Sequence, residues 1–205
     1  MFSPRPHDLL RVSSGRVLPS DAPPWASGAL SVTPWVVARR AGARMGRIAV
    51  GVRGKSRSER YATAVDPADV CEVVAPEDLA HVLPRRCREL AAMCALNTVG
   101  PVMDNTGLPW GPTGSVGFEL ASATPAATPD SDLDLLLRLP RGSSAALMGL
   151  AALHREFRSL AVLVDCQVEI HCGAVALAEL VGAQSDVMVR TTAGPRLVPR
   201  AVAVS

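Results

Sequence analysis

Two aspartates, Asp132 and Asp134, occupy alternate positions at the start of an apolar run that continues over residues 135–137. Such alternation is typical of a strand, and it would place both carboxylates on one face with Leu133 on the other. Neighbouring carboxylates repel each other, and their partial burial is costly without a positive partner. A divalent cation is the simplest partner, and Mg²⁺ commonly takes one or two carboxylates together with substrate phosphates. The pair therefore predicts a magnesium site.

Gly114 and Ser115 lie upstream of these aspartates, where a short apolar segment begins. Glycine lets the backbone approach an anion closely, and the N–H groups that open a helix point toward it. The Gly-Ser pair therefore predicts a binding site for phosphate groups, complementary to the site of the metal ion.

A further apolar strand is predicted over residues 161–170. Its polar residues, Asp165, Gln167 and Glu169, share one face, while valine, cysteine and isoleucine residues occupy the other. Solvent exposure on an edge strand is one explanation for this polar face. The alternative is that the face lies beside Asp132 and Asp134 and adds a third acid to the site.

These motifs resemble a known family. Gly-Ser followed by Asp-x-Asp in an apolar strand is similar to the signature of the nucleotidyltransferase superfamily of polymerase-beta type. One branch of this superfamily is resembled more closely. The sequence segments that carry this resemblance are WGPTGSVGFELAS and SDLDLLLR, together with HDLL and IAVGVRGKSRSERYA in the N-terminal half. That branch is the malonate decarboxylase holo-acyl-carrier-protein synthases, also called phosphoribosyl-dephospho-CoA transferases. The resemblance covers nearly the whole chain.

The resemblance implies roles for the acids. The superfamily has a third carboxylate in the strand that follows Asp-x-Asp, and LVDCQ matches that place best. Asp132, Asp134 and Asp165 are therefore expected to be the catalytic and metal-binding residues, with Glu169 as the second choice for the third position. The implied cofactor is Mg²⁺.

The resemblance also implies the substrates. The donor would be triphosphoribosyl-dephospho-CoA, and the acceptor a serine on the apo acyl-carrier subunit of malonate decarboxylase, with release of pyrophosphate. Many members of the broader superfamily carry an arginine shortly after Gly-Ser, but this chain has residues 116–119, VGFE, there. This departure argues against an ordinary nucleoside triphosphate as the donor.

A basic segment in the N-terminal half is a candidate for substrate binding. Arg53, Lys55, Arg57 and Arg60 are interleaved with glycine and serine, a composition that can surround phosphate groups. A solvated, charged loop is an equally good explanation of the spacing alone. The resemblance favours contact of this segment with the substrate or the carrier protein.

Composition argues against several other classes of protein. The 205 residues are 48% hydrophobic, which excludes general disorder, and the net charge of +2 gives no case for nucleic acid or a membrane surface. No apolar run approaches the roughly 20 residues of a membrane span, and no secretory signal is evident. The five cysteines show no metal-ligand spacing and are interpreted as buried apolar residues. A cytoplasmic protein is expected.

The predicted fold class is α+β (α/β), with a boundary near residue 75. Residues 1–75 are expected to form a small β-rich domain for substrate or partner binding, with a hairpin from residues 35–39 and 48–53. Residues 76–205 are expected to form a catalytic domain of nucleotidyltransferase fold, whose mixed sheet is flanked by helices. The other expected elements are a loose lead-in over 1–34 with a helix start at 7–10, helices over 85–98, 144–160 and 174–181, a strand over 108–113, a flexible connection over 120–130, and a closing hairpin over 187–198.

Two other functions remain open from the residues. The chain could be a nucleotidyltransferase that acts on another acceptor, such as a small molecule, RNA or a partner protein. It could also be a non-catalytic module that binds a CoA-like nucleotide or a carrier protein. Clustered negative charge facing a phosphate argues against the pure binding module.

Overall fold

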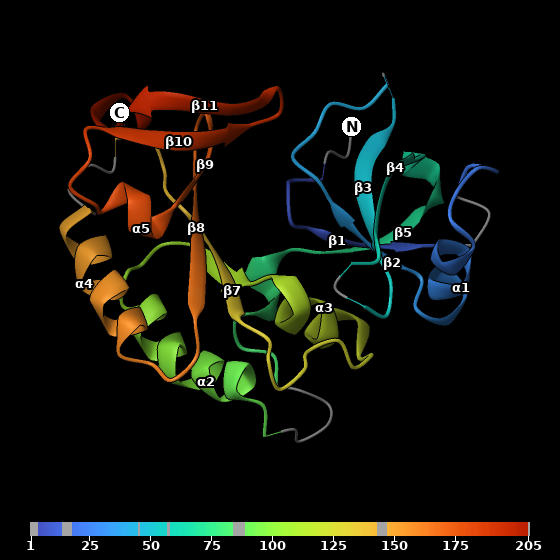
Figure 1. The fold of residues 1–205 in the computed structure, drawn as a ribbon, viewed down its shortest axis with the longest axis horizontal. Coiled ribbons are helices and arrows are strands. Elements are labelled where there is room, and N and C mark those ends of the chain that lie inside the picture. The colour runs from blue at the N-terminus through green and yellow to red at the C-terminus, as the bar shows by residue number, and fades with distance from the viewer. Residues whose placement is uncertain are drawn as a thin grey trace. The chain divides into compact units, whose positions relative to one another are not determined.

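The structure is a computed structural model that describes residues 4–13, 18–44, 46–56, 58–83, 89–142 and 147–204. The chain divides into two compact units, Met1–Ala75 and Pro76–Ser205 (Figure 1). A five-stranded sheet forms the centre of the first unit and a six-stranded sheet that of the second, and helices accompany both. The predicted α+β class is therefore confirmed.

The first unit is an antiparallel sheet with strand order β4-β3-β2-β1-β5. The predicted hairpin is confirmed, since β2 pairs with β3. The unit's elements are β1 (Leu9–Val12), α1 (Pro24–Val32), β2 (Trp35–Ala38), β3 (Ile48–Arg53), β4 (Arg60–Val65), the 3-10 helix η2 (Pro67–Asp69) and β5 (Val70–Val74).

The expectation of a loose N-terminal lead-in with a helix start at residues 7–10 is wrong. Leu9 and Leu10 begin β1, which lies between β2 and β5 and donates and accepts hydrogen bonds on both sides. Asp8 accepts a hydrogen bond from the Arg5 backbone N–H (2.7 Å) instead of capping a helix. Sheet pairing over a long sequence distance decides the conformation here, and no short-range pattern reports it.

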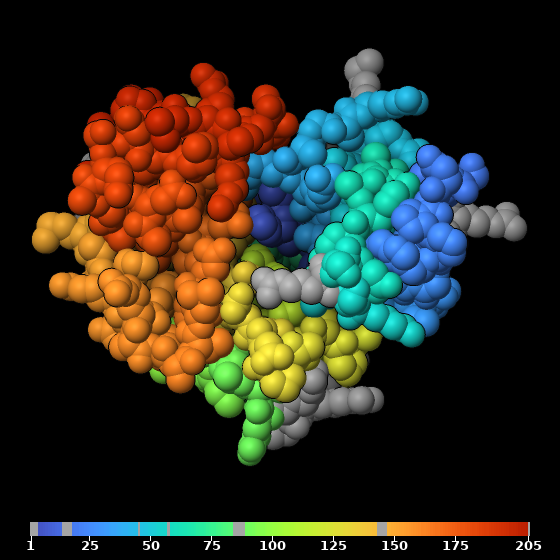
Figure 2. All heavy atoms as spheres, in the orientation of Figure 1, coloured from blue at the N-terminus to red at the C-terminus, as the bar shows by residue number. Residues whose placement is uncertain are grey.

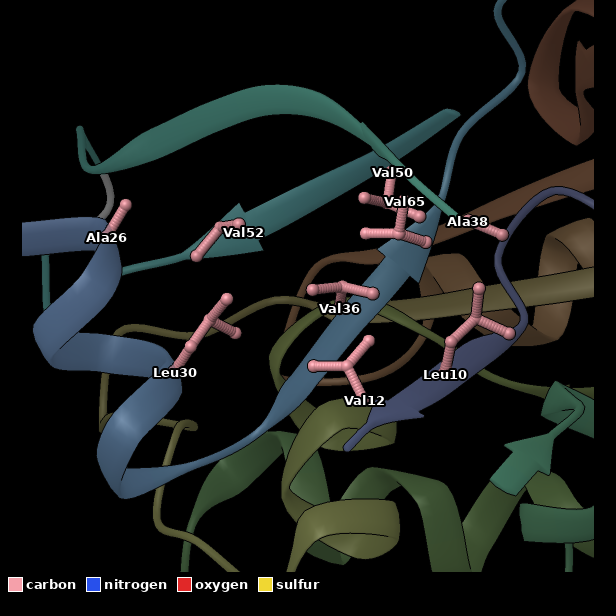
Figure 3. Packing of buried hydrophobic residues seen from close by; sticks show 9 residues of the cluster. All are labelled: Leu10, Val12, Ala26, Leu30, Val36, Ala38, Val50, Val52 and Val65. Carbon is pink, nitrogen blue, oxygen red and sulfur yellow. The ribbon is translucent and has the colours of Figure 1, made fainter. Parts of the chain in front are cut away.

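One hydrophobic cluster holds the first unit together. In Figure 3, side chains from α1 point toward side chains from the sheet, so that the helix covers one sheet face. Pro24 at the start of α1 has the backbone angle that a first helical position needs. The cluster consists of Leu10, Val12, Ala26, Leu30, Val36, Ala38, Val50, Val52 and Val65.

The second unit contains a mixed sheet with strand order β11-β10-β9-β8-β7-β6. Only β7 and β8 are paired in parallel among its described strands, and α4 makes the crossover between them. Its elements are η3 (Pro76–Leu79), α2 (Ala91–Asp104), β6 (Trp110–Pro112), α3 (Gly114–Ser122), β7 (Leu133–Arg138), α4 (Leu147–Arg158), β8 (Val164–Ile170), β9 (Gly173–Ala176), α5 (Leu177–Leu180), β10 (Asp186–Thr191), β11 (Gly194–Pro199) and α6 (Arg200–Ala203).

The helix predicted over 85–98 is displaced along the chain. Residues 84–88 lie outside the described residues, and α2 begins at Ala91 and continues through Pro101 to Asp104. Val99 and Met103 are four residues apart on its buried side. Their burial, worth about 1.5–3 kcal/mol each, offsets the roughly 3 kcal/mol that an interior proline costs.

The helix predicted over 174–181 is wrong in its first half. Ala174 and Val175 belong to β9, which pairs with β8, and only Leu177–Leu180 is helical. Both residues are fully buried, so pairing within the sheet outweighs the helix propensity of alanine. Three other expected elements are observed with small shifts: α4 lies within 144–160, β8 within 161–170, and β10 with β11 forms the closing hairpin.

The outer strands β11 and β6 each contain proline, at Pro195, Pro199 and Pro112. Figure 2 shows the surface made by the hairpin of β10 and β11 in red and by α4 in orange. In the described parts of the chain, helices all fall short of the length and apolar character that crossing a bilayer would require.

We expect Leu30→Ala to destabilise the first unit by about 2–5 kcal/mol, because it removes a side chain that is 2% exposed from the cluster. Val32→Ala in the same helix is the matched control, since that side chain is 78% exposed, and its effect should stay within about 0.5 kcal/mol. Urea unfolding of the full chain followed by circular dichroism measures both. Equal losses would contradict the packing of α1 described here.

Candidate active site

The parallel pairing of β7 with β8 brings two predicted acids side by side. Asp134 and Asp165 are direct partners in the register of the two strands. Neighbouring strands are about 4.8 Å apart, so the two side chains leave the same sheet face from adjacent positions. β8 lies between β7 and β9, which excludes the explanation of its polar face as that of an edge strand. Asp132 precedes β7 by one residue and is half-buried.

The start of α3 lies directly against the Asp134 carboxylate. Gly114 has a φ of +58°, a left-handed conformation that favours glycine. A Cβ at this position would collide with Oδ2 of Asp134 and lie 2.7 Å from its Cγ. The Thr113 backbone N–H donates to the Asp134 carbonyl oxygen (2.8 Å). Glycine is therefore required at position 114 both by backbone conformation and by the close approach of an acid.

The first N–H groups of α3 belong to residues at this same end of the helix. The first hydrogen bond within α3 runs from the Gly117 N–H to the Thr113 carbonyl oxygen (2.8 Å). The N–H groups of Gly114 and Ser115 come before this bond, so they have no acceptor within the helix. Gly117 also lets the helix approach β6 closely, since a Cβ there would lie 2.5 Å from the Pro112 carbonyl oxygen. A helix N-terminus favours anions.

A phosphate and the Asp134 carboxylate at one helix end would repel each other unless a cation lay between them. Within the part of the chain that the structure describes, no group of three or more His, Cys, Asp or Glu side chains is arranged to hold a metal ion. The in-register pair Asp134 and Asp165 is the donor set that the sheet supplies. Two carboxylates fit Mg²⁺, which completes its shell with water and substrate phosphates. The three-aspartate metal site stays a prediction.

Arg138 connects the far end of β7 to two acids. Its Nε donates to Oε1 of Glu77 and its Nη1 donates to Oε2 of Glu169, and all three side chains are at most 20% exposed. Arg138 and Glu169 are partners in the β7–β8 register, four residues beyond Asp134 and Asp165. Glu169, the second choice for the third acid, is thus held in an ion pair away from the aspartates. We call Arg138, Glu77 and Glu169 the arginine bridge.

Nothing in the sequence pattern pointed to the arginine bridge, because Glu77 is 61 residues from Arg138. Glu77 belongs to η3, which lies on β6. Gly111 permits this contact, since a Cβ there would lie 2.7 Å from the Glu77 backbone nitrogen. The bridge therefore ties the first residues of the second unit to the register that aligns the two aspartates.

The cysteine beside Asp165 is not a nucleophile. Burial, with a smaller effect of the Asp165 charge, raises the pKa of the Cys166 thiol, so that it stays protonated. The interpretation of the cysteines as buried is wrong for Cys71, Cys94 and Cys172, which are exposed. Cys87 lies outside the described residues.

The predicted basic segment is the tip of the hairpin between β3 and β4. Arg53 and Arg60 are register partners at the ends of these strands, and Lys55 is exposed at the tip. Arg60 Nη1 donates to the carbonyl oxygens of Ser56 (3.2 Å) and Glu59 (3.0 Å), so part of its guanidinium braces the loop. Arg57 lies outside the described residues.

Glu59 gives this loop its shape. Its carboxylate accepts a hydrogen bond from the Ser56 backbone N–H (2.9 Å), and this bond lowers the pKa of the Glu59 carboxyl. Gly54 leaves room for it, since a Cβ there would lie 2.6 Å from Glu59 Oε2. These basic residues belong to the first unit and the aspartates to the second.

Comparison with known proteins decides the family. Residues 78–201 match the model of the phosphoribosyl-dephospho-CoA transferase MdcG C-terminal domain, and residues 5–76 match that of the corresponding N-terminal domain. The chain belongs to the phosphoribosyl-dephospho-CoA transferase family. The family is one of transferases, and the resemblance to the phosphoribosyl-dephospho-CoA transferases is confirmed.

Curated relatives with the name phosphoribosyl-dephospho-CoA transferase match nearly the full length. One from Pseudomonas putida is 38% identical over 205 residues, which covers 97% of this chain and 95% of the relative. One from Pseudomonas syringae pathovar tomato is 40% identical, covering 94% and 90% of the two chains, and one from Azotobacter vinelandii is 40% identical, covering 95% and 92%. No solved structure matches the chain significantly.

We expect Gly114→Ala to destabilise the chain by at least about 1–2 kcal/mol, the cost of a left-handed non-glycine residue, with a further cost for displacing Asp134. Gly149→Ala is the control, because Gly149 lies inside α4 and a Cβ there would meet no other atom within 4 Å. That change should stabilise by about 0.5–1 kcal/mol. Thermal unfolding measures both, and a neutral Gly114→Ala would contradict the close approach.

Arg138→Met should cost about 3–5 kcal/mol, because it leaves two largely buried carboxylates without their cation. Adding Glu77→Gln and Glu169→Gln should recover much of the lost stability, because no buried carboxylate is then left without a cation. Arg11→Met is the comparison variant, because its pair with Glu72 (3.5 Å) is about half exposed and should be worth about 1 kcal/mol or less. Urea unfolding distinguishes these outcomes, and equal costs for both arginines would refute the buried bridge.

Proposed function

We propose that this chain transfers the phosphoribosyl-dephospho-CoA group from triphosphoribosyl-dephospho-CoA to a serine of the apo acyl-carrier subunit of malonate decarboxylase. The observation that carries the proposal is the match to both domains of the transferase family, over nearly the full length of its relatives. The aligned aspartates and the glycine-opened helix supply chemistry that suits this reaction. We place it among the nucleotidyltransferases and expect it to work in the cytoplasm.

The reaction is a displacement at phosphorus. The serine hydroxyl oxygen bonds to the phosphorus atom attached to the ribose, the bond from that phosphorus to the next bridging oxygen breaks, and pyrophosphate leaves. The product is a phosphodiester between the carrier serine and the prosthetic group. Positioning and charge neutralisation account for most catalysis of this kind, so no covalent protein nucleophile is required.

Asp134 and Asp165 would hold Mg²⁺ in this proposal, with Asp132 as a further ligand. The ion would neutralise charge on the polyphosphate and lower the pKa of the attacking hydroxyl. The adjacency of Asp134 and Asp165 in the sheet supports their role. Asp165 is the more exposed of the two, and it would either complete the metal site or accept the proton from the serine hydroxyl.

Gly114 and Ser115 would bind the departing phosphates. Their backbone N–H groups precede the first intrahelical bond of α3, and the serine adds a hydroxyl donor. Donors placed at the leaving group stabilise the charge that develops as the bond breaks. Arg53, Lys55, Arg57 and Arg60 of the first unit are proposed to contact the precursor or the carrier protein.

Asp134→Asn and Asp165→Asn should each lower transfer by at least about 100-fold with folding retained, because each keeps the side-chain shape and removes a metal-binding charge. Asp130→Asn, an exposed aspartate in the preceding turn, is the control and should leave the rate unchanged. Pyrophosphate release and the mass increase of the apo carrier measure transfer, and circular dichroism measures folding.

Three results would revise the proposal. Wild-type rates in Asp134→Asn would remove this aspartate from the site. Transfer of AMP from ATP, without use of the precursor, would favour a nucleotidyltransferase with another acceptor. Binding of the precursor without pyrophosphate release in the presence of Mg²⁺ and apo carrier would favour a binding module.

A further inference from the structure

The connection between α3 and β7 is fixed by a buried acid. Glu119 lies in α3 and is 7% exposed. Its Oε2 accepts hydrogen bonds from the backbone N–H groups of Ala126 (2.8 Å) and Ala127 (2.9 Å). Hydrogen bonds to a charged acceptor are the stronger kind, and burial excludes competing water. One carboxylate oxygen therefore ties the middle of the connection to the helix.

Further contacts hold both ends of this connection. Ala123 adopts a left-handed conformation, with φ of +56°, and turns the chain back at the end of α3. Ser122 Oγ donates to the Phe118 carbonyl oxygen (2.6 Å) and accepts from Thr124 N–H (3.2 Å). Before Asp132, Ser131 Oγ accepts from the Thr128 N–H (2.9 Å). The connection expected over 120–130 therefore begins inside α3, and hydrogen bonds hold the irregular part that follows the helix.

Glu119 occupies the middle of a closed segment. The Thr113 N–H donates to the Asp134 carbonyl oxygen (2.8 Å), so the two ends of the segment 113–134 are hydrogen-bonded to each other where it leaves and rejoins the sheet. The first part of this excursion carries Gly114, and the last part carries Asp132. Glu119 is the cross-link between the two parts, through its hydrogen bonds to Ala126 and Ala127.

We propose that Glu119 is a positioning residue, which holds the end of the connection that carries Asp132 at a fixed distance from the start of α3. This inference rests on the function proposed above for those two ends. It assigns Glu119 no contact with the substrate. Loss of the cross-link lets the two parts move relative to each other, and displacements of about 1 Å can lower a rate by about 100-fold.

The test compares Glu119→Ala and Glu119→Gln in the full chain, with Glu156→Ala as the control. Glu156 is an exposed glutamate in α4 of the same unit. Alanine removes both hydrogen bonds, whereas the single amide oxygen of glutamine can still accept both N–H groups without the charge. The two measurements are hydrogen exchange over residues 120–132 and the kinetics of prosthetic-group transfer.

In Glu119→Ala we expect the Ala126 and Ala127 amides to exchange at least about tenfold faster. The kcat for transfer should fall by about 10- to 100-fold, while KM for the precursor changes less than about threefold. Glu119→Gln should restore much of both properties, and Glu156→Ala should match the wild type. A residue with a purely structural role would change stability without this effect on kcat or its rescue by glutamine.

The possible failures are distinguishable. Unchanged exchange in both Glu119 variants would overturn the cross-link. Faster exchange with unchanged kcat would overturn the positioning role and leave the proposed function intact. A wild-type chain that exchanges as expected but shows no transfer would overturn the proposed function and, with it, the positioning role. If Glu119→Ala does not fold, Glu119→Gln alone tests the proposal. Any loss of kcat in Glu119→Gln should then come with faster exchange of the Ala126 and Ala127 amides, and slower turnover without faster exchange would contradict the proposal.

Discussion

The parallel register of β7 and β8 is the constraint on which the candidate site depends. It places two aspartates at directly neighbouring positions of adjacent strands, an arrangement that costs free energy through like-charge repulsion. A slip of one residue would turn the whole polar face of β8 to the other side of the sheet. The arginine bridge opposes such a slip, because Arg138 pairs with Glu169 across these same two strands and reaches Glu77 outside them. Opposite charges thus hold the register that brings like charges together.

Local sequence patterns revealed the parts of the site that are made by short-range rules. The alternation of polar and apolar residues predicted the strand around Asp134 and the polar face of β8, and the Gly-Ser pair indicated the start of α3. These features depend on side-chain periods of a strand or on the backbone freedom of glycine, both of which can be read from neighbouring residues. The family resemblance then supplied the expected substrates, which cannot be derived from any side-chain period.

The parts that the sequence did not reveal depend on distant partners. Residues 7–10 resemble a helix start, but they lie between two strands that come much later in the chain. Glu119 looks like an ordinary helix residue until the connection folds back onto it, and Arg138 looks like the exposed end of a strand until Glu77 covers it. In each case the deciding contact joins residues whose proximity exists only in the folded chain.

The prolines in the outer strands have a consequence for association between molecules. An exposed strand edge offers unpaired N–H and C=O groups on which another chain can form an intermolecular sheet. Pro195 and Pro199 in β11 and Pro112 in β6 have no N–H to contribute to such a ladder. Both borders of the six-stranded sheet thus carry built-in protection against strand-to-strand aggregation, although the sheet between them is rich in leucine and valine.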